Sequence, residues 1–191
     1  MGVSNVIEYV TMSSEGNATD FGDFSANRDQ MGSCGNTTRG VFSGGFYVGL
    51  GTSGNTKSNV IDYITIASTG NVTDFGDLTV GRQSVGSGVT SSSTRGLTMG
   101  GDAGSDSDVI DYITIASTGN ATDFGDLTSG RSLCFSTSNA TKAVCGRDSW
   151  INDNNIDVVT IASTGNATDF GDLVKSLRGQ TGACGGQGGL S

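Results

Sequence analysis

The chain has 191 residues, of which 34% are hydrophobic and 32 are glycine, and it contains no proline and no histidine. Its 19 acidic and 10 basic residues give a formal net charge of −9, and such a surface repels phosphate groups and anionic lipid headgroups, so we expect neither a nucleic-acid partner nor a membrane partner. The lack of histidine removes the commonest general base and the commonest ligand of transition metals, which disfavours an enzyme.

One phrase occurs four times along the chain: NVIEYVTMSSEGNATDFGDF from Asn5, NVIDYITIASTGNVTDFGDL from Asn59, DVIDYITIASTGNATDFGDL from Asp108, and NIDVVTIASTGNATDFGDL from Asn155. Its isoleucines recur at intervals of 54, 49 and 46 residues, at Ile7, Ile61, Ile110 and Ile156. This period is typical of a supersecondary unit stacked on copies of itself. No linker separates the units, so we expect one repeat domain over residues 1–191, with units restarting near residues 5, 59, 108 and 155.

Within one unit the sequence predicts four strands and no α-helix, because glycine is frequent and no apolar stripe repeats at helical spacing. Val60 to Ile66 is apolar on both faces, so we expect it to be buried between two other sheets. The more polar segment Val72 to Phe75 fits an outer edge strand. The small residues of Gln83 to Val89 suit a crowded inner strand, and Thr94 to Met99 forms the strand that ends in Gly100-Gly101.

The two ends of the chain match complementary parts of one unit. The chain opens with Val6 to Thr11, which matches the third strand, and it finishes after Arg178 to Cys184, which matches the first strand. Pairing of these segments would close a ring of four units. The residues GGQGGLS that follow lack a second strand, so closure by another subunit and an open stack that oligomerises are the alternatives, and we expect a homo-oligomer.

The order of these elements resembles the kelch repeat, in which a strand ends in a double glycine and an arginine opens the next unit. The glycine pairs and their degraded forms are Gly44-Gly45, Gly100-Gly101, Gly146-Arg147 and Gly185-Gly186, and the arginines are Arg28, Arg82, Arg131 and Arg178. Kelch units carry tryptophan on the fourth strand, where this chain has Phe21, Phe75, Phe124 and Phe170. The resemblance implies an all-β, kelch-like β-propeller of about four antiparallel four-stranded blades.

The phrase IDYITIASTGNATDFGDL, which starts at Ile110, is also similar to repeats in large structural proteins of tailed phages that infect aquatic bacteria, especially cyanophages. This similarity covers nearly the whole chain. It implies a location in the virion, for example in an exposed fibre, with other virion proteins and a glycan or protein of the host surface as partners.

We interpret the repeated polar residues as structural. Four of the N-x-T sequons occupy the same turn position after glycine, where we expect asparagine for its tolerance of left-handed geometry rather than for glycosylation. The paired aspartates of TDFGD occur in every unit, whereas a catalytic pair occurs once per site, so we expect turn capping and ion pairs with nearby arginines. On neighbouring strands Arg95 is predicted to lie diagonal to Asp111, with Arg39 and Lys142 in the equivalent places.

Cysteine and the acidic loop give two further hypotheses. The chain has no CxxC pair, so a zinc site is not supported, and we expect reduced, buried cysteines, with a Cys134–Cys145 disulfide as the alternative. The loop Asp102 to Asp111, which includes Asp106 and Asp108, has oxygen ligands for calcium but lacks the glycine and glutamate of an EF-hand loop. We therefore expect no cofactor, with calcium as the alternative.

The variable connections between the strands are the predicted recognition surface of a non-enzymatic virion protein, because nearly identical strands carry no partner-specific information. The candidate binding residues on these connections are Phe46, Tyr47, Asp102, Asp106, Asp108 and Trp150. One alternative is a glycan-processing propeller enzyme, for which Glu8 and Glu15 are the only glutamates. The other is an intracellular kelch-type interaction scaffold.

Overall fold

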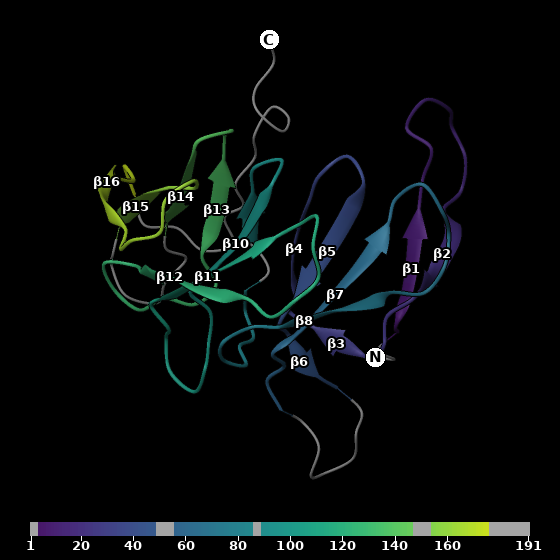
Figure 1. Ribbon diagram of the computed structural model, residues 1–191, viewed down its shortest axis with the longest axis horizontal. Helices are drawn as coiled ribbons and strands as arrows, with labels where there is room; N and C mark the ends of the chain where they lie inside the picture. Colours follow the sequence, from purple (N-terminus) through teal and green to yellow (C-terminus); the bar gives the residue numbers. More distant parts are fainter. Residues whose placement is uncertain (1–3, 49–55, 86–88, 147–153, 176–191) are drawn as a thin grey trace.

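The structure, a computed structural model, describes residues 4–48, 56–85, 89–146 and 154–175, and every helix or strand assigned in these ranges is a β-strand (Figure 1). The expected all-β class is confirmed. None of the described residues forms a helix long and apolar enough to cross a membrane. The expected strand over Arg178 to Cys184 lies outside the described residues, so ring closure stays a prediction.

Three four-stranded antiparallel sheets contain most of the strands. Sheet I consists of β4 (Gly32–Gly35), β5 (Arg39–Ser43), β7 (Val60–Thr65) and β8 (Thr73–Asp77). Sheet II consists of β9 (Val89–Ser91), β10 (Arg95–Met99), β11 (Val109–Thr114) and β12 (Thr122–Asp126). Sheet III consists of β13 (Phe135–Ser138), β14 (Lys142–Gly146), β15 (Asn155–Thr160) and β16 (Thr168–Asp172).

Two smaller strand pairs complete the described structure. The N-terminal hairpin pairs β1 (Val6–Tyr9) with β2 (Thr19–Asp23), which are the third and fourth strands of a unit. The other pair joins β3 (Arg28–Asp29) to β6 (Phe46–Tyr47) beside sheet I. The N-terminal hairpin lies at one end of the molecule and sheet III at the other, with sheets I and II between them (Figure 1).

The hydrophobic core fills the spaces between neighbouring sheets. One cluster, between sheets I and II, includes Val41, Phe75 and Ile113, and a second, between sheets II and III, includes Ile110 and Val159. Strand β11 therefore packs into both clusters and is buried on both faces. The segment predicted to be buried in this way, Val60 to Ile66, is only half-buried on the face of Val60 and Ile64, and its Ile66 is 49% exposed, because only the two-stranded hairpin covers it. The first strands also gather together, because β9 lies against β4 and against β13.

Each TDFGD segment forms a bulged outer strand. In sheet I, Ile61 pairs with Gly76 and the next residue, Asp62, pairs with Asp74, so Phe75 is the extra residue of a β-bulge. The same shift occurs where β11 meets β12, where β15 meets β16 and in the N-terminal hairpin. Because of the bulge, Phe75 has no partner residue on β7.

The turn of the next sheet bonds to this bulged strand. The N–H of Gly119 donates to the carbonyl oxygen of Phe75 at 2.7 Å, and the N–H of Asp77 donates to Oδ1 of Asn120 at 3.1 Å. A Cβ at Gly76, which has φ 143°, would lie 2.5 Å from the Gly119 carbonyl oxygen. Only glycine allows both this backbone angle and this approach.

Equivalent bonds join the N-terminal hairpin to sheet I and sheet II to sheet III. Gly70 donates to the Phe21 carbonyl oxygen and Gly165 to that of Phe124, each at 2.7 Å. The expectation of left-handed asparagine was wrong, because Gly119, and not Asn120, has the positive φ. The asparagine is needed for its side-chain oxygen, which accepts a bond from the preceding unit.

Residues 83–85, which the sequence predicts to belong to the inner strand of sheet II, lie outside its ladder. Strand β9 begins at Val89, whereas Gln83 forms an isolated bridge with Asp102. The outer strand β8 is shifted by one to two residues relative to Val72 to Phe75.

Ile66 and Ile115 occupy the same repeat position but are 49% and 0% exposed. Ile115→Asp would place an unpaired carboxylate between sheets I and II and should lower the free energy of unfolding by about 3–5 kcal/mol. Ile66→Asp is the matched control and should lower it by less than about 1 kcal/mol. Urea denaturation followed by circular dichroism measures both, and equal losses would contradict this packing.

Candidate functional site

A buried arginine–aspartate pair lies inside each of the three sheets. The pairs are Arg28–Asp62, Arg82–Asp111 and Arg131–Asp157. In every pair the arginine side chain is 0% exposed and the aspartate side chain at most 2%. The nitrogen–oxygen distance is 2.5 Å between Arg82 and Asp111 and 2.8 Å between Arg131 and Asp157. These are the only salt bridges with both partners buried among the described residues.

Two of these arginines, Arg28 and Arg82, also tie together the ends of two strands, and Arg131 donates to the carbonyl oxygen of Cys145 in β14 at 3.2 Å. In sheet II, Nη1 of Arg82 donates to the carbonyl oxygens of Gly100 at 3.0 Å and Val109 at 2.6 Å. The aspartate accepts a second bond from Oγ1 of Thr79, at 2.6 Å. In sheet I the same places are taken by Gly44, Val60 and Ser25. The double glycine therefore supplies an acceptor for the buried guanidinium.

Burial dominates the electrostatics of Asp62 and Arg82, which belong to two of these pairs. Burial raises the pKa of Asp62 above its ordinary value, although the nearby Arg28 guanidinium lowers it. Burial likewise lowers the pKa of Arg82, against the attraction of Asp111. Both shifts mean that desolvation of the charges is only partly offset by the pairing, as is common for buried ion pairs. The pairs are therefore suited to fixing strand register more than to adding stability.

The predicted pairing of Arg95 with Asp111 was wrong. Strand register places Arg95 opposite Thr114, and its guanidinium lies 4.6 Å from the centre of the Tyr112 ring. Its Nη1 donates to the carbonyl oxygen of Ile161 in sheet III, at 2.9 Å. Arg39 makes the equivalent contacts, with Tyr63 and Ile115. These arginines join neighbouring sheets, while Asp157 pairs with Arg131 and not with Lys142.

The expected turn capping and ion pairing of the TDFGD aspartates were wrong, because two of these aspartates bond to the backbone of the bulge within the outer strand and none forms a salt bridge among the described residues. Asp123 and Asp169 accept bonds from the N–H groups of Gly125 and Gly171, two residues further on. All salt bridges to repeated arginines in the described ranges involve the aspartate of the third strand. The sequence feature that could have predicted the buried pairs is the aspartate that recurs within the apolar third strand, at Asp62, Asp111 and Asp157.

The structure brings part of the predicted recognition surface together. Phe46 lies in β6 and forms a bridge with Lys57, whose Nζ binds Oδ1 of Asp102 at 2.6 Å. Tyr47 is half-buried beside Phe46, pairing with Arg28. The described parts of the connections of sheets I and II, residues 44–48 with 56–58 and residues 100–108, therefore meet at Lys57 and Asp102.

The remaining predicted residues are more dispersed. Asp106 accepts a bond from Oγ of Ser132 at 2.6 Å, and Asp108 is exposed before β11. Trp150 lies outside the described residues. No group of three or more Cys, Asp or Glu residues in the described ranges is arranged to hold a metal ion. Asp102 in particular already accepts bonds from Lys57, Gln83 and the Gly104 N–H.

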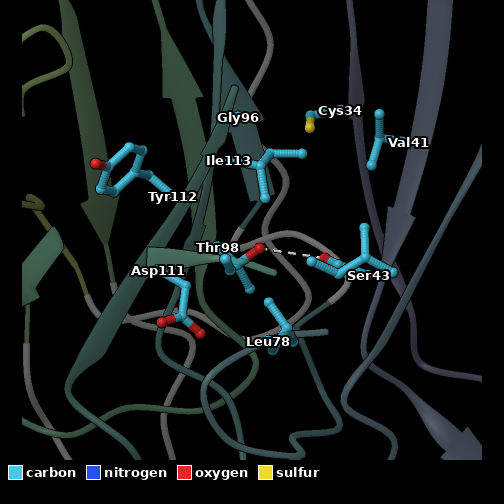
Figure 2. A pocket seen from close by; sticks show the side chains of 11 residues that line it. Cys34, Val41, Ser43, Leu78, Gly96, Thr98, Asp111, Tyr112 and Ile113 are labelled. Carbon is cyan, nitrogen blue, oxygen red and sulfur yellow. Dashed lines mark hydrogen bonds between the residues drawn. The ribbon is translucent and has the colours of Figure 1, made fainter. Parts of the chain in front are cut away.

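The space between sheets I and II is tightly filled. The cavity there has a volume of about 10 Å³ and is lined by side chains that include Cys34, Val41 and Ile113 (Figure 2). Ser43 and Thr98 share a hydrogen bond of 3.2 Å across it. Small-molecule sites have volumes of roughly 300–1,000 Å³, so this cavity is a packing gap.

The described cysteines, Cys34, Cys134 and Cys145, are free. The Cys34 thiol points into the packed space between the sheets, and burial raises its pKa to about 12. The adjacent Cys134 thiol and burial raise the pKa of Cys145. Neither of these two thiols has the lowered pKa of a nucleophile. The chain matches no protein-family model and no curated protein.

Removal of one member of a buried pair should be strongly destabilising. Asp111→Ala leaves the Arg82 guanidinium buried and uncompensated and should lower the free energy of unfolding by about 3–5 kcal/mol. The double variant Arg82→Met with Asp111→Leu should recover most of this loss. Asp102→Ala, in the partly exposed pair with Lys57, is the control and should lose less than about 1 kcal/mol. A double variant as unstable as Asp111→Ala would contradict this account.

Proposed function

We propose that the chain is a kelch-like β-propeller module of a phage virion, with sheets I to III as blades, and that it is a non-enzymatic structural protein exposed for attachment. The gathering of β4, β9 and β13 supports the propeller, since the first strand of each blade lies nearest the axis. The similarity of the repeated phrase to those of phage structural proteins supports the virion assignment. The partner is a host-surface glycan or protein, or a neighbouring virion protein.

One observation supports a structural role more than any other: the repeated charged side chains bond within the protein. The arginine–aspartate pairs are sealed inside the sheets, and Arg39 and Arg95 join one sheet to the next. The charged side chains that recur in each unit therefore hold the fold together. Partner-specific chemistry is left to the connections, which differ between units.

The connections 44–58 and 100–108 supply a suitable recognition surface. They carry the half-buried aromatic residues Phe46 and Tyr47 and the acidic residues Asp102, Asp106 and Asp108, and the Lys57–Asp102 pair holds them side by side. Aromatic and amphipathic side chains on a rigid scaffold are typical anchors for glycans and proteins. The strands behind them hold the surface in a fixed shape.

Substitution of the predicted recognition residues should weaken attachment without unfolding the protein. Phe46→Ala with Tyr47→Ala, Asp106→Ala with Asp108→Ala, and Trp150→Ala should each reduce binding of the labelled chain to host cells about tenfold or more. Val80→Ala, at an exposed site in the linker between sheets I and II, is the control. Flow cytometry with cyanobacterial and other aquatic bacterial cells, and binding to purified virions, measure the effect.

Two results would contradict the proposal. Parent-like binding by all three variants would place recognition elsewhere on the surface. Absence of binding by the parent chain to every cell type and to virions would remove the attachment role itself. Thermal unfolding of each variant distinguishes lost binding from lost folding.

A further inference from the structure

The two ends of the molecule carry complementary halves of the junction that joins its sheets. Inside the molecule, each junction consists of a turn with the sequence Gly-Asn and the bulged outer strand of the preceding unit. The N-terminal hairpin has such a turn at Gly16-Asn17, and sheet III has such a strand in β16. Neither of these is occupied within the described residues.

Side-chain burial shows how differently the end surfaces and the internal junctions are covered. Phe75 and Phe124 are each 2% exposed beneath the turn of the next sheet, whereas the equivalent Phe170 on β16 is 60% exposed. On the turn side, Ile115 and Ile161 are 0% and 2% exposed where a four-stranded sheet precedes the turn, and Ile66 is 49% exposed where only the two-stranded hairpin precedes it. The residue at their position in the hairpin, Met12, is 97% exposed.

The glycines at the same positions agree with this comparison. A Cβ built at Gly76 or Gly125 would lie within 2.6 Å of backbone atoms of the next turn. A Cβ built at Gly171, on β16, meets nothing within 4 Å. Gly171 nevertheless has φ 139°, the same bulged geometry as the occupied glycines. The β16 backbone is thus already shaped to accept a turn.

A groove beside β16 continues the vacant surface. It has a volume of about 260 Å³, and Lys142, Val158 and Thr168 are among the residues that line it. Lys142 and Val158 stand at the repeat positions of Arg95 and Tyr112, since each basic residue pairs with the threonine that ends the third strand. In the internal junction, Arg95 reaches the carbonyl oxygen of Ile161. Lys142 is therefore placed to reach the corresponding carbonyl oxygen, that of Met12.

We propose that the turn at residues 12–17 of one copy of this chain docks on β16 of a second copy, so that the molecules assemble head to tail. The docked turn would place the Gly16 N–H on the Phe170 carbonyl oxygen and Oδ1 of Asn17 on the Asp172 N–H. Met12 would cover the Lys142 groove. The interface would be a fourth copy of a junction that the chain makes three times. Gly16, unlike Gly70, Gly119 and Gly165, has no positive φ in the free hairpin, so it would adopt that backbone angle on docking.

A second copy is the occupant because the two surfaces face apart in one molecule. The N-terminal hairpin and β16 lie at opposite ends of the long axis (Figure 1). Two different surfaces that pair head to tail form a heterologous interface, which gives rings or filaments rather than a closed two-fold dimer. The inference does not depend on the virion assignment, and it names a partner that the proposed function leaves open.

Met12→Asp and Phe170→Asp test the two halves of the interface separately. Both residues are exposed in one molecule, so neither change should alter the thermal unfolding temperature of the folded chain. We expect the parent to form larger species as its concentration rises, and each variant to remain monomeric, with association weakened at least about tenfold. Analytical ultracentrifugation over a range of concentrations measures this. Met12→Leu and Val80→Asp are the controls and should assemble like the parent.

A mixture of the two variants distinguishes head-to-tail assembly from other modes. Met12→Asp keeps an intact β16, and Phe170→Asp keeps an intact turn. An equimolar mixture should therefore form a heterodimer in which the turn of the Phe170→Asp variant docks on β16 of the Met12→Asp variant. Continued monomers in the mixture would overturn the proposal, as would a monomeric parent at every concentration. A monomeric parent that Met12→Asp also destabilises would instead establish ring closure within one chain. None of these readouts depends on binding to cells or virions.

Discussion

A guanidinium sealed against a carboxylate inside each sheet is the interaction on which the rest of this structure depends. The arginine precedes the first strand and bonds to the end of the second strand and to the aspartate within the third strand, and in sheets I and II it also bonds to the start of the third strand. Arg82, for example, meets Gly100, Val109 and Asp111 at once. Because a one-residue slip would bury both charges unpaired, each pair specifies the register of its sheet.

The buried pair also explains the glycines around it. At Gly100, with φ 67°, a Cβ would lie 2.6 Å from the carbonyl oxygen of Arg131, the arginine that opens the next unit. The N–H of Gly101 donates to that same oxygen at 2.8 Å. The double glycine thus contacts two arginines. The Gly100 carbonyl oxygen accepts a bond from the guanidinium of Arg82, and the Gly101 N–H donates to the backbone carbonyl oxygen of Arg131. One charged residue per unit links the inside of a sheet to the following sheet.

The junctions between sheets determine what remains for function. Backbone bonds from a turn to a bulged strand, reinforced by Arg39 and Arg95, use the repeated polar groups. The surfaces left over are of two kinds: the connections that vary from unit to unit, and the half-junctions at the two ends. A repeat protein of this design can present one surface to a foreign partner and another to its own copies without changing any strand.

The sequence by itself determined the number of units, the all-β class and most strand positions, because the four phrases and the turn glycines act over a few neighbouring residues. It indicated that Asp111 and the repeated arginines were structural but assigned them the wrong partners. Arg82 and Asp111 are distant along the chain, and strand register together with the bulge at the outer strand decides which basic residue reaches the aspartate. The same holds for Asn120, whose partner lies in the preceding sheet. Tertiary packing also decided that Ile115 is buried while Ile66 and Met12, at the same repeat position, are exposed, since burial depends on whether a complete sheet precedes the residue in space.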